Sequence, residues 1–153
     1  MTTIHDNQVR LSRVYSHPPE RVFQAFARAE AVANWLSPSP DIAMSVETFL
    51  FRPEGRYRYA YRLEDGSILT VTGTFLVIDP PRTIAFSWCW EPPDPHAGID
   101  SHVHITLTPV SDGTLLELTH ASLTAPGMPE RHGAGWLGTL DRLQHHLETD
   151  LPE

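Results

Sequence analysis

The chain has 153 residues, 41% of them apolar and 20% charged, which predicts one compact domain over residues 1–153 with a hydrophobic core. Its net charge is −8 with neutral histidines, and no run of Lys or Arg stands out, which argues against nucleic acid and anionic membranes as partners. The start lacks the apolar core of a signal peptide, and no apolar run approaches the roughly 18–20 residues of a membrane span, so we expect a cytoplasmic protein.

The first third of the chain predicts one strand followed by two short helices. Apolar and polar side chains alternate over residues 9–14, which favours a short strand. Apolar residues then recur at helical spacing over 19–27, directly after a proline pair, and a proline in the first helical turn loses no hydrogen bond. A second short helix is expected over 30–36, because Pro38 and Pro40 break the pattern and indicate a loop.

From residue 42 onward the pattern is typical of strands separated by turns. Residues 56–63 alternate between one mainly basic face and one face of tyrosines and leucine, the period of a sheet with one wet and one buried side. Further strands are predicted over residues 42–51, 68–78, 83–90, 102–110 and 114–122. Six or seven sequential strands indicate an antiparallel meander, and a strongly curved one can wrap around a helix.

The last long segment, residues 130–148, predicts an amphipathic helix. Fully burying each large side chain of its apolar stripe contributes on the order of 1.5–3 kcal/mol, so this face needs a large apolar partner. The stripe consists of Gly133, Trp136, Leu140, Leu143 and Leu147. The opposite side collects Arg131, Gly138, Arg142, His145 and Thr149.

Three glycines, Gly133, Gly135 and Gly138, lie in the first half of this predicted helix. Each destabilises a helix interior by about 0.8–1 kcal/mol relative to alanine, so the first half should be weaker than the second. We hypothesise that the first turns yield around an entrance between the helix and the strand loops.

Short motifs occur in a defined order along nearly the whole chain. They are Pro18-Pro19-Glu20-Arg21-Val22-Phe23, Phe51-Arg52-Pro53-Glu54-Gly55-Arg56-Tyr57, Gly73-Thr74-Phe75, Phe86-Ser87-Trp88, Leu118-Thr119-His120 and Gly135-Trp136. In this order the chain resembles the single-domain bacterial proteins of the family named for the activator of the heat-shock-protein-90 ATPase, within the START-like, Bet-v-type helix-grip (SRPBCC) superfamily. It departs from that pattern at Glu54, where such sequences usually carry a glycine.

The resemblance implies an α+β helix-grip fold. A curved, seven-stranded antiparallel sheet would wrap around the long C-terminal helix and an internal cavity, with two short helices between strands 1 and 2. Members of the family look like carriers of hydrophobic ligands, chaperone cofactors or enzymes on polyketide-like substrates. We expect this chain to bind a small, largely apolar molecule, with no cofactor, as a monomer or homodimer.

Two other functions stay open. One is a protein-interaction module of a stress response, which would contact a heat-shock chaperone through the sheet exterior and the acidic loops. The other is a cavity enzyme, a hydrolase or cyclase, that would use His120. The chain has no G-x-S-x-G motif, phosphate-binding glycine loop or paired-cysteine motif, so no catalytic residue is predicted from a motif.

Aromatic and imidazole side chains are the candidate lining of the cavity. They could equally form a filled core, although their flat faces and polar edges suit a flat apolar ligand. His120 shares a strand face with Leu116 and Leu118 and should point inward, either to orient a ligand or as a buried histidine bonded to backbone or to His132. The candidates are Trp35, Tyr57, Tyr59, Tyr61, Phe86, Trp88, Trp90, His120, His132 and Trp136.

The remaining histidines and the single cysteine have structural interpretations. His102 and His104 share a strand face, but the residues between them are apolar and should point inward, so these histidines face water and no metal site is expected. His145 and His146 should be solvated on the polar side of the last helix. Cys89 cannot form an internal disulfide and is expected to be a packing residue rather than a nucleophile.

Overall fold

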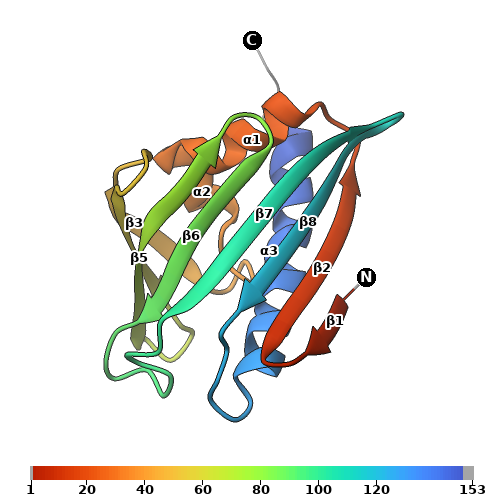
Figure 1. Cartoon of the computed structure of the whole chain (residues 1–153). Coiled ribbons are helices and arrows are strands. Elements are labelled where there is room, and N and C mark those ends of the chain that lie inside the picture. Colours follow the sequence, from red (N-terminus) through yellow and green to blue (C-terminus); the bar gives the residue numbers. More distant parts are fainter. Residues whose placement is uncertain (1, 150–153) are drawn as a thin grey trace.

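The computed structural model describes residues 2–149, which form one antiparallel sheet of eight strands and three helices (Figure 1). The strands run in the order β1-β2-β8-β7-β6-β5-β4-β3 across the sheet. In chain order the elements are β1 (Thr2–His5), β2 (Gln8–Tyr15), α1 (Pro19–Ala27), α2 (Ala29–Trp35), β3 (Ala43–Phe49), β4 (Arg56–Arg62), β5 (Ile68–Asp79), β6 (Thr83–Trp90), β7 (Ser101–Val110), β8 (Gly113–Ala121) and α3 (Met128–Thr149).

The predicted class and order of elements are confirmed, but the predicted seven strands are one too few. The missed strand is β1, which forms an edge hairpin with β2. All its side chains are exposed, so it lacks the alternation that reveals a half-buried strand. Its turn residues Asp6 and Asn7 adopt φ of 50° and 62°, the left-handed geometry that suits a tight hairpin. Within residues 2–149, no helix has the length and apolar character needed to cross a membrane.

Alternation in the strands builds the inner face of the sheet. In β4, Tyr57, Tyr59 and Tyr61 are buried while the intervening side chains are less so. Shifts in register on β3 and β5 mark bulges, which increase local twist and bend a sheet. The sheet curves around α3 and closes the core with α1 and α2 (Figure 1).

The apolar stripe of α3 is buried as predicted. Trp136, Leu140, Leu143 and Leu147 are each no more than 5% exposed. The prediction that His146 is solvated was wrong: it is buried, because it lies three residues after Leu143 and therefore at the edge of the stripe.

Polar side chains fix the position of α3. The Tyr15 hydroxyl donates to the Leu140 carbonyl oxygen at 2.9 Å, and Arg21 donates to the Leu147 carbonyl oxygen at 2.6 Å. Arg142 donates to the Asn34 carbonyl oxygen at 3.0 Å. The backbone of α3 lies close to β1, β2, α1 and α2. Side chains and a cavity occupy the space between α3 and the half of the sheet formed by β4, β5 and β6.

Gly138 allows the loop after α2 to lie directly on α3. A Cβ atom at this position would be 2.2 Å from the carbonyl oxygen of Pro38, a distance that real contacts do not reach. At Gly135 a Cβ atom would meet nothing within 4 Å. Gly138 is therefore needed for packing, whereas Gly135 is not. Whether the glycines also let the first turns of α3 yield stays a prediction, which amide hydrogen exchange would test.

The two glycines predict opposite effects of the same substitution. Gly135→Ala should raise the free energy of unfolding by about 0.8–1 kcal/mol, because alanine is the better helix former and has room. Gly138→Ala should lower it by roughly 1–3 kcal/mol, because the methyl group forces the loop away. Urea denaturation of both variants would measure this, and equal effects would contradict the packing role of Gly138.

Candidate functional site

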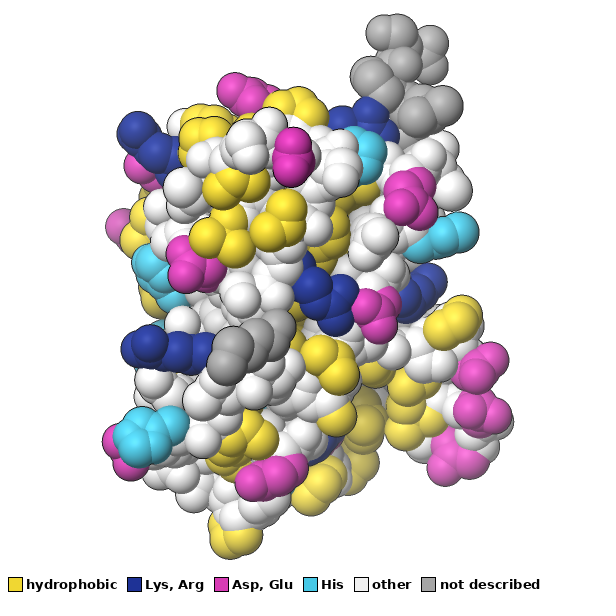
Figure 2. All heavy atoms as spheres, turned by 90° about the vertical axis from the view of Figure 1, so that its right-hand side faces the viewer, with side chains coloured by type: hydrophobic (Ala, Val, Ile, Leu, Met, Phe, Trp, Pro, Cys, Tyr) yellow, Lys and Arg dark blue, Asp and Glu magenta, His cyan; other side chains and the backbone are white. Residues whose placement is uncertain are grey.

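A cavity of about 240 Å³ lies between α3, the loop after α2 and the strands β4 to β6. The molecular face shown in Figure 2 is hollowed beside a lobe that carries acidic side chains, and hydrophobic side chains line the hollow. The cavity is lined by Leu36, Pro38, Ile42, Tyr61, Leu63, Leu69, Trp88, Trp90, Arg131, His132, Gly135, Trp136 and Thr139.

The predicted lining residues divide into two sets. Lining the cavity are Tyr61, Trp88, Trp90, His132 and Trp136. Buried in the surrounding core, and absent from the lining, are Trp35, Tyr57, Tyr59, Phe86 and His120. Sequence reasoning missed the aliphatic wall, because no local pattern shows that the loop containing Pro38 folds back onto α3.

His120 belongs to a chain of buried hydrogen bonds. The indole Nε1–H of Trp136 donates to His120 Nδ1 at 2.9 Å, and an indole can only donate. The imidazole proton is therefore on Nε2, which donates to Ser101 Oγ at 2.8 Å. Ser101 in turn donates to the Trp88 carbonyl oxygen at 2.7 Å. We expected a buried His120 to hydrogen-bond the backbone or His132, and this prediction was wrong. His132 instead packs against His120 edge to face, with the ring centroids 5.0 Å apart.

His132 also accepts a hydrogen bond from an indole N–H, but here the tryptophan belongs to the sheet rather than to α3. Trp90 Nε1–H donates to His132 Nε2 at 3.0 Å, so Nδ1 carries the proton and donates to the Met128 carbonyl oxygen at 2.8 Å. Burial lowers the pKa of His132 to about 4 and holds the pKa of His120 well below its usual value. Both rings are neutral at pH 7, and each has both nitrogens engaged.

One residue of the cavity wall, Arg131, belongs to an ion pair. Arg131 was expected on the polar side of α3, but it lines the cavity and its guanidinium lies 4.6 Å from the ring centre of Trp90. It donates to both carboxylate oxygens of Asp94, at 2.8 and 2.6 Å, and the Asp94 side chain is fully buried. Burial alone would raise the pKa of Asp94, but hydrogen bonds from Arg131 and the His96 backbone N–H bring it below its usual value.

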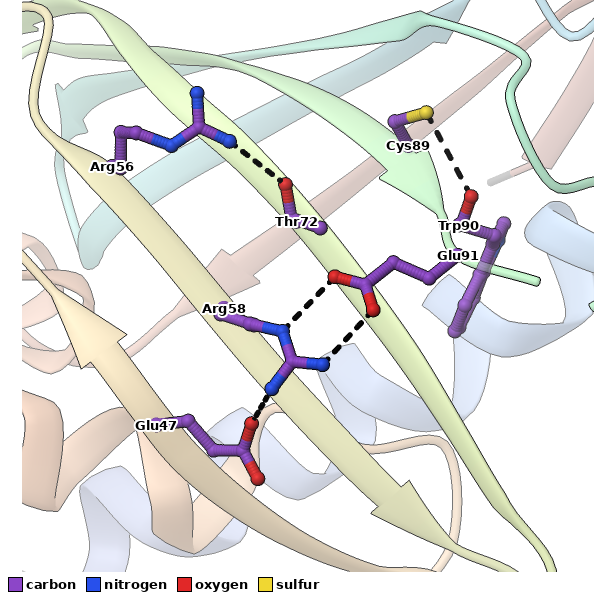
Figure 3. Close-up of polar contacts among 7 residues, drawn as sticks. All are labelled: Glu47, Arg56, Arg58, Thr72, Cys89, Trp90 and Glu91. Atoms are coloured by element: carbon purple, nitrogen blue, oxygen red, sulfur yellow. Dashed lines mark hydrogen bonds and ion pairs between the residues drawn. The ribbon is translucent and has the colours of Figure 1, made fainter. Parts of the chain in front are cut away.

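The other face of the sheet carries a separate polar cluster. Figure 3 shows Arg58 between two carboxylates: it donates to both oxygens of Glu91 at 2.9 Å and also to Glu47. The bonds from Arg58 lower the pKa of Glu91. Cys89 lies on this outer face, because its neighbours Trp88 and Trp90 point inward. The sheet therefore separates its thiol from the cavity.

His102 and His104 are exposed, as the alternation of their strand predicts. Within residues 2–149 the structure contains no group of three or more His, Cys, Asp or Glu side chains placed to hold a metal ion.

The curved sheet around a C-terminal helix, with a cavity between them, defines a helix-grip α+β protein. The family model of activator of Hsp90 ATPase homolog 1-like proteins matches residues 16–148, and the chain belongs to this family.

Solved structures agree with this assignment. A protein from Chromobacterium violaceum is 30% identical with a TM-score of 0.84, and the match covers 97% of this chain and 100% of that one. An AHSA1 protein from Silicibacter pomeroyi is 26% identical with a TM-score of 0.82, covering 94% and 99%. CalU16 from Micromonospora echinospora is 27% identical with a TM-score of 0.68, covering 94% and 77%. None of the curated proteins matches the chain.

The buried histidines predict a loss of stability in mild acid. An unfolded histidine takes up a proton near pH 6.5, whereas folded His132 does so only near pH 4. Between these values protons favour the unfolded chain, so the free energy of unfolding should fall by up to about 1.4 kcal/mol per pH unit for each such histidine. His132→Gln should reduce this slope in denaturation curves between pH 6.5 and 4.5. Identical slopes would contradict the assignment.

The Asp94–Arg131 pair predicts unequal effects of breaking it from either side. Arg131→Gln leaves a fully buried carboxylate without its cation and should lower the free energy of unfolding by about 3–5 kcal/mol. Asp94→Asn should lower it less, because the Arg131 side chain is 30% exposed and water can solvate it. Arg58→Gln, in the exposed pair, is the matched control and should have a much smaller effect. Urea denaturation would measure all three, and a larger effect of Asp94→Asn would contradict this ordering.

Proposed function

We propose that the chain binds a small, largely apolar molecule in the cavity between α3 and strands β4 to β6. The observation that carries this proposal is the composition of the cavity wall. Aliphatic side chains of Leu36, Leu63 and Leu69 face the same space of about 240 Å³ as the rings of Trp90 and Trp136. Burying apolar ligand surface against such a wall contributes about 25 cal/mol per Å².

The polar groups of the wall support the same proposal, because most of them are already bonded within the protein. The Tyr61 hydroxyl donates to the Leu36 carbonyl oxygen at 3.0 Å. The Thr139 hydroxyl donates to the Gly135 carbonyl oxygen at 2.7 Å. Water in the cavity would find few partners there, so an apolar ligand displaces it at little loss of hydrogen bonding.

The enzyme alternative has less support. A general acid or base needs a free nitrogen within reach of a substrate, but both nitrogens of His120 are bonded to Trp136 and Ser101. His120 is fully buried and does not line the cavity. The interaction with a heat-shock chaperone stays a prediction, which co-purification with the ATPase would test.

Filling the cavity should abolish binding without unfolding the protein. Small neutral aromatic compounds should raise the melting temperature of the wild type, because a ligand that binds only the folded state stabilises it. Gly135→Leu places a side chain in the open space at that position and should remove the shift. Gly135→Ala is the matched control and should retain most of it.

Differential scanning fluorimetry and native mass spectrometry would measure both effects. Wild-type protein that shows neither a shift nor a bound molecule would contradict the proposed function. If the compound raised the melting temperature of Gly135→Leu as much as that of the wild type, binding would lie outside the cavity.

A further inference from the structure

The mouth of the cavity is formed by three segments of the chain. The deeper residues of the lining are buried, and the half-buried ones mark where the cavity opens to solvent. They come from the loop after α2, from the β4–β5 hairpin and from the first half of α3. These mouth residues are Pro38, Ile42, Leu63, Leu69, Arg131 and Gly135. The opening is therefore apolar except at Arg131.

Each of the three segments carries an exposed carboxylate beside the mouth. Asp41, Glu64 and Glu130 each adjoin a mouth residue in the sequence, and Asp65 follows Glu64 in the hairpin. None of these four side chains forms an ion pair within residues 2–149. The exposed base that adjoins a mouth residue is Arg62. Acidic side chains also gather on the lobe beside the hollow in Figure 2. The charge around the mouth is therefore negative, and such a field concentrates cations at an opening.

The interior of the cavity offers little to a bound anion. Among the lining residues, Arg131 alone carries a permanent charge, and both its terminal nitrogens donate to Asp94. The indole N–H groups of Trp90 and Trp136 donate to histidines, and the Tyr61 hydroxyl donates to a backbone carbonyl oxygen. A carboxylate in the cavity would lose its hydration and gain little in return.

We propose that the ligand is a hydrophobic amine, whose apolar body lies in the cavity and whose protonated amino group stays at the mouth. This inference rests on the proposed function and names the class of ligand. Burial of the apolar body against the wall supplies the affinity, and the carboxylates of Asp41, Glu64, Asp65 and Glu130 select the charge of the head group. The ammonium group keeps its contact with water at the mouth, so no charge is buried.

Three probes with the same naphthalene body and different head groups test this proposal: 2-(1-naphthyl)ethylamine, 2-(1-naphthyl)ethanol and 1-naphthylacetate. The amine is protonated at pH 7, because alkyl amines titrate near about pH 10. In calorimetric titrations at about 10 mM salt, the amine should bind the wild type about threefold more tightly than the alcohol, and naphthylacetate should bind most weakly. Raising the salt to about 1 M shortens the screening length from about 30 Å to about 3 Å, so the affinities of amine and alcohol should converge.

Substitutions at the mouth separate its charge from that of the whole protein. Glu64→Gln combined with Glu130→Gln should weaken binding of the amine by about three- to fivefold at low salt, with the alcohol unchanged. Glu54→Gln combined with Glu117→Gln is the matched control, because it removes the same charge from exposed residues that do not adjoin the lining. It should leave the ratio of the two affinities as in the wild type.

Gly135→Leu locates the bound amine, because it should abolish binding of both amine and alcohol if their naphthalene lies in the cavity. An amine that still binds this variant would overturn the proposal. So would an amine-to-alcohol affinity ratio that is unchanged by salt or by the substitutions at the mouth. Binding of the alcohol alone would overturn the role of the mouth and leave the proposed cavity binding intact. If neither amine nor alcohol binds the wild type, both proposals fall.

Discussion

Two tryptophan–histidine hydrogen bonds join α3 to the sheet, and the arrangement of the cavity depends on them. In one the helix donates, from Trp136 to His120; in the other the sheet donates, from Trp90 to His132. Both require a neutral imidazole, since an indole N–H needs an accepting nitrogen. Burial supplies that condition by lowering both pKa values, which keeps the rings neutral. The indole donors then fix the tautomer of each ring.

The cavity follows from how α3 packs. The backbone of α3 lies close to β1 and β2 at one edge of the sheet and to the two short helices on its other side. Between α3 and strands β4 to β6 lie side chains and the cavity. Large rings line that space without filling it, and the charge of Arg131 in its wall is balanced by Asp94. The result is a largely apolar wall. Behind it, the covered indole Nε1–H of Trp88 has no hydrogen-bond partner within residues 2–149.

Local patterns were sufficient to predict most of the fold. Alternation in the strands and the stripe of α3 reflect burial of one face, which sequence periodicity records directly. Local patterns were insufficient where the position of a residue depends on contacts between segments far apart in the sequence. The exposed β1 has no alternation. Arg131 falls on the polar side of its helix by sequence periodicity, yet it lines the cavity and pairs with Asp94 from the loop after β6. The unpaired donor of Trp88 is visible only once the partners of the other tryptophans are known.

The contact between Gly138 and Pro38 has a consequence for how related cavities diverge. Gly138 does not line the cavity, yet the loop that rests on it supplies Leu36, Pro38 and Ile42 to the wall. A side chain at this position would displace that part of the wall as a unit. Cavity size can therefore change between relatives through a residue that never touches the ligand, and a comparison of lining residues alone would overlook it.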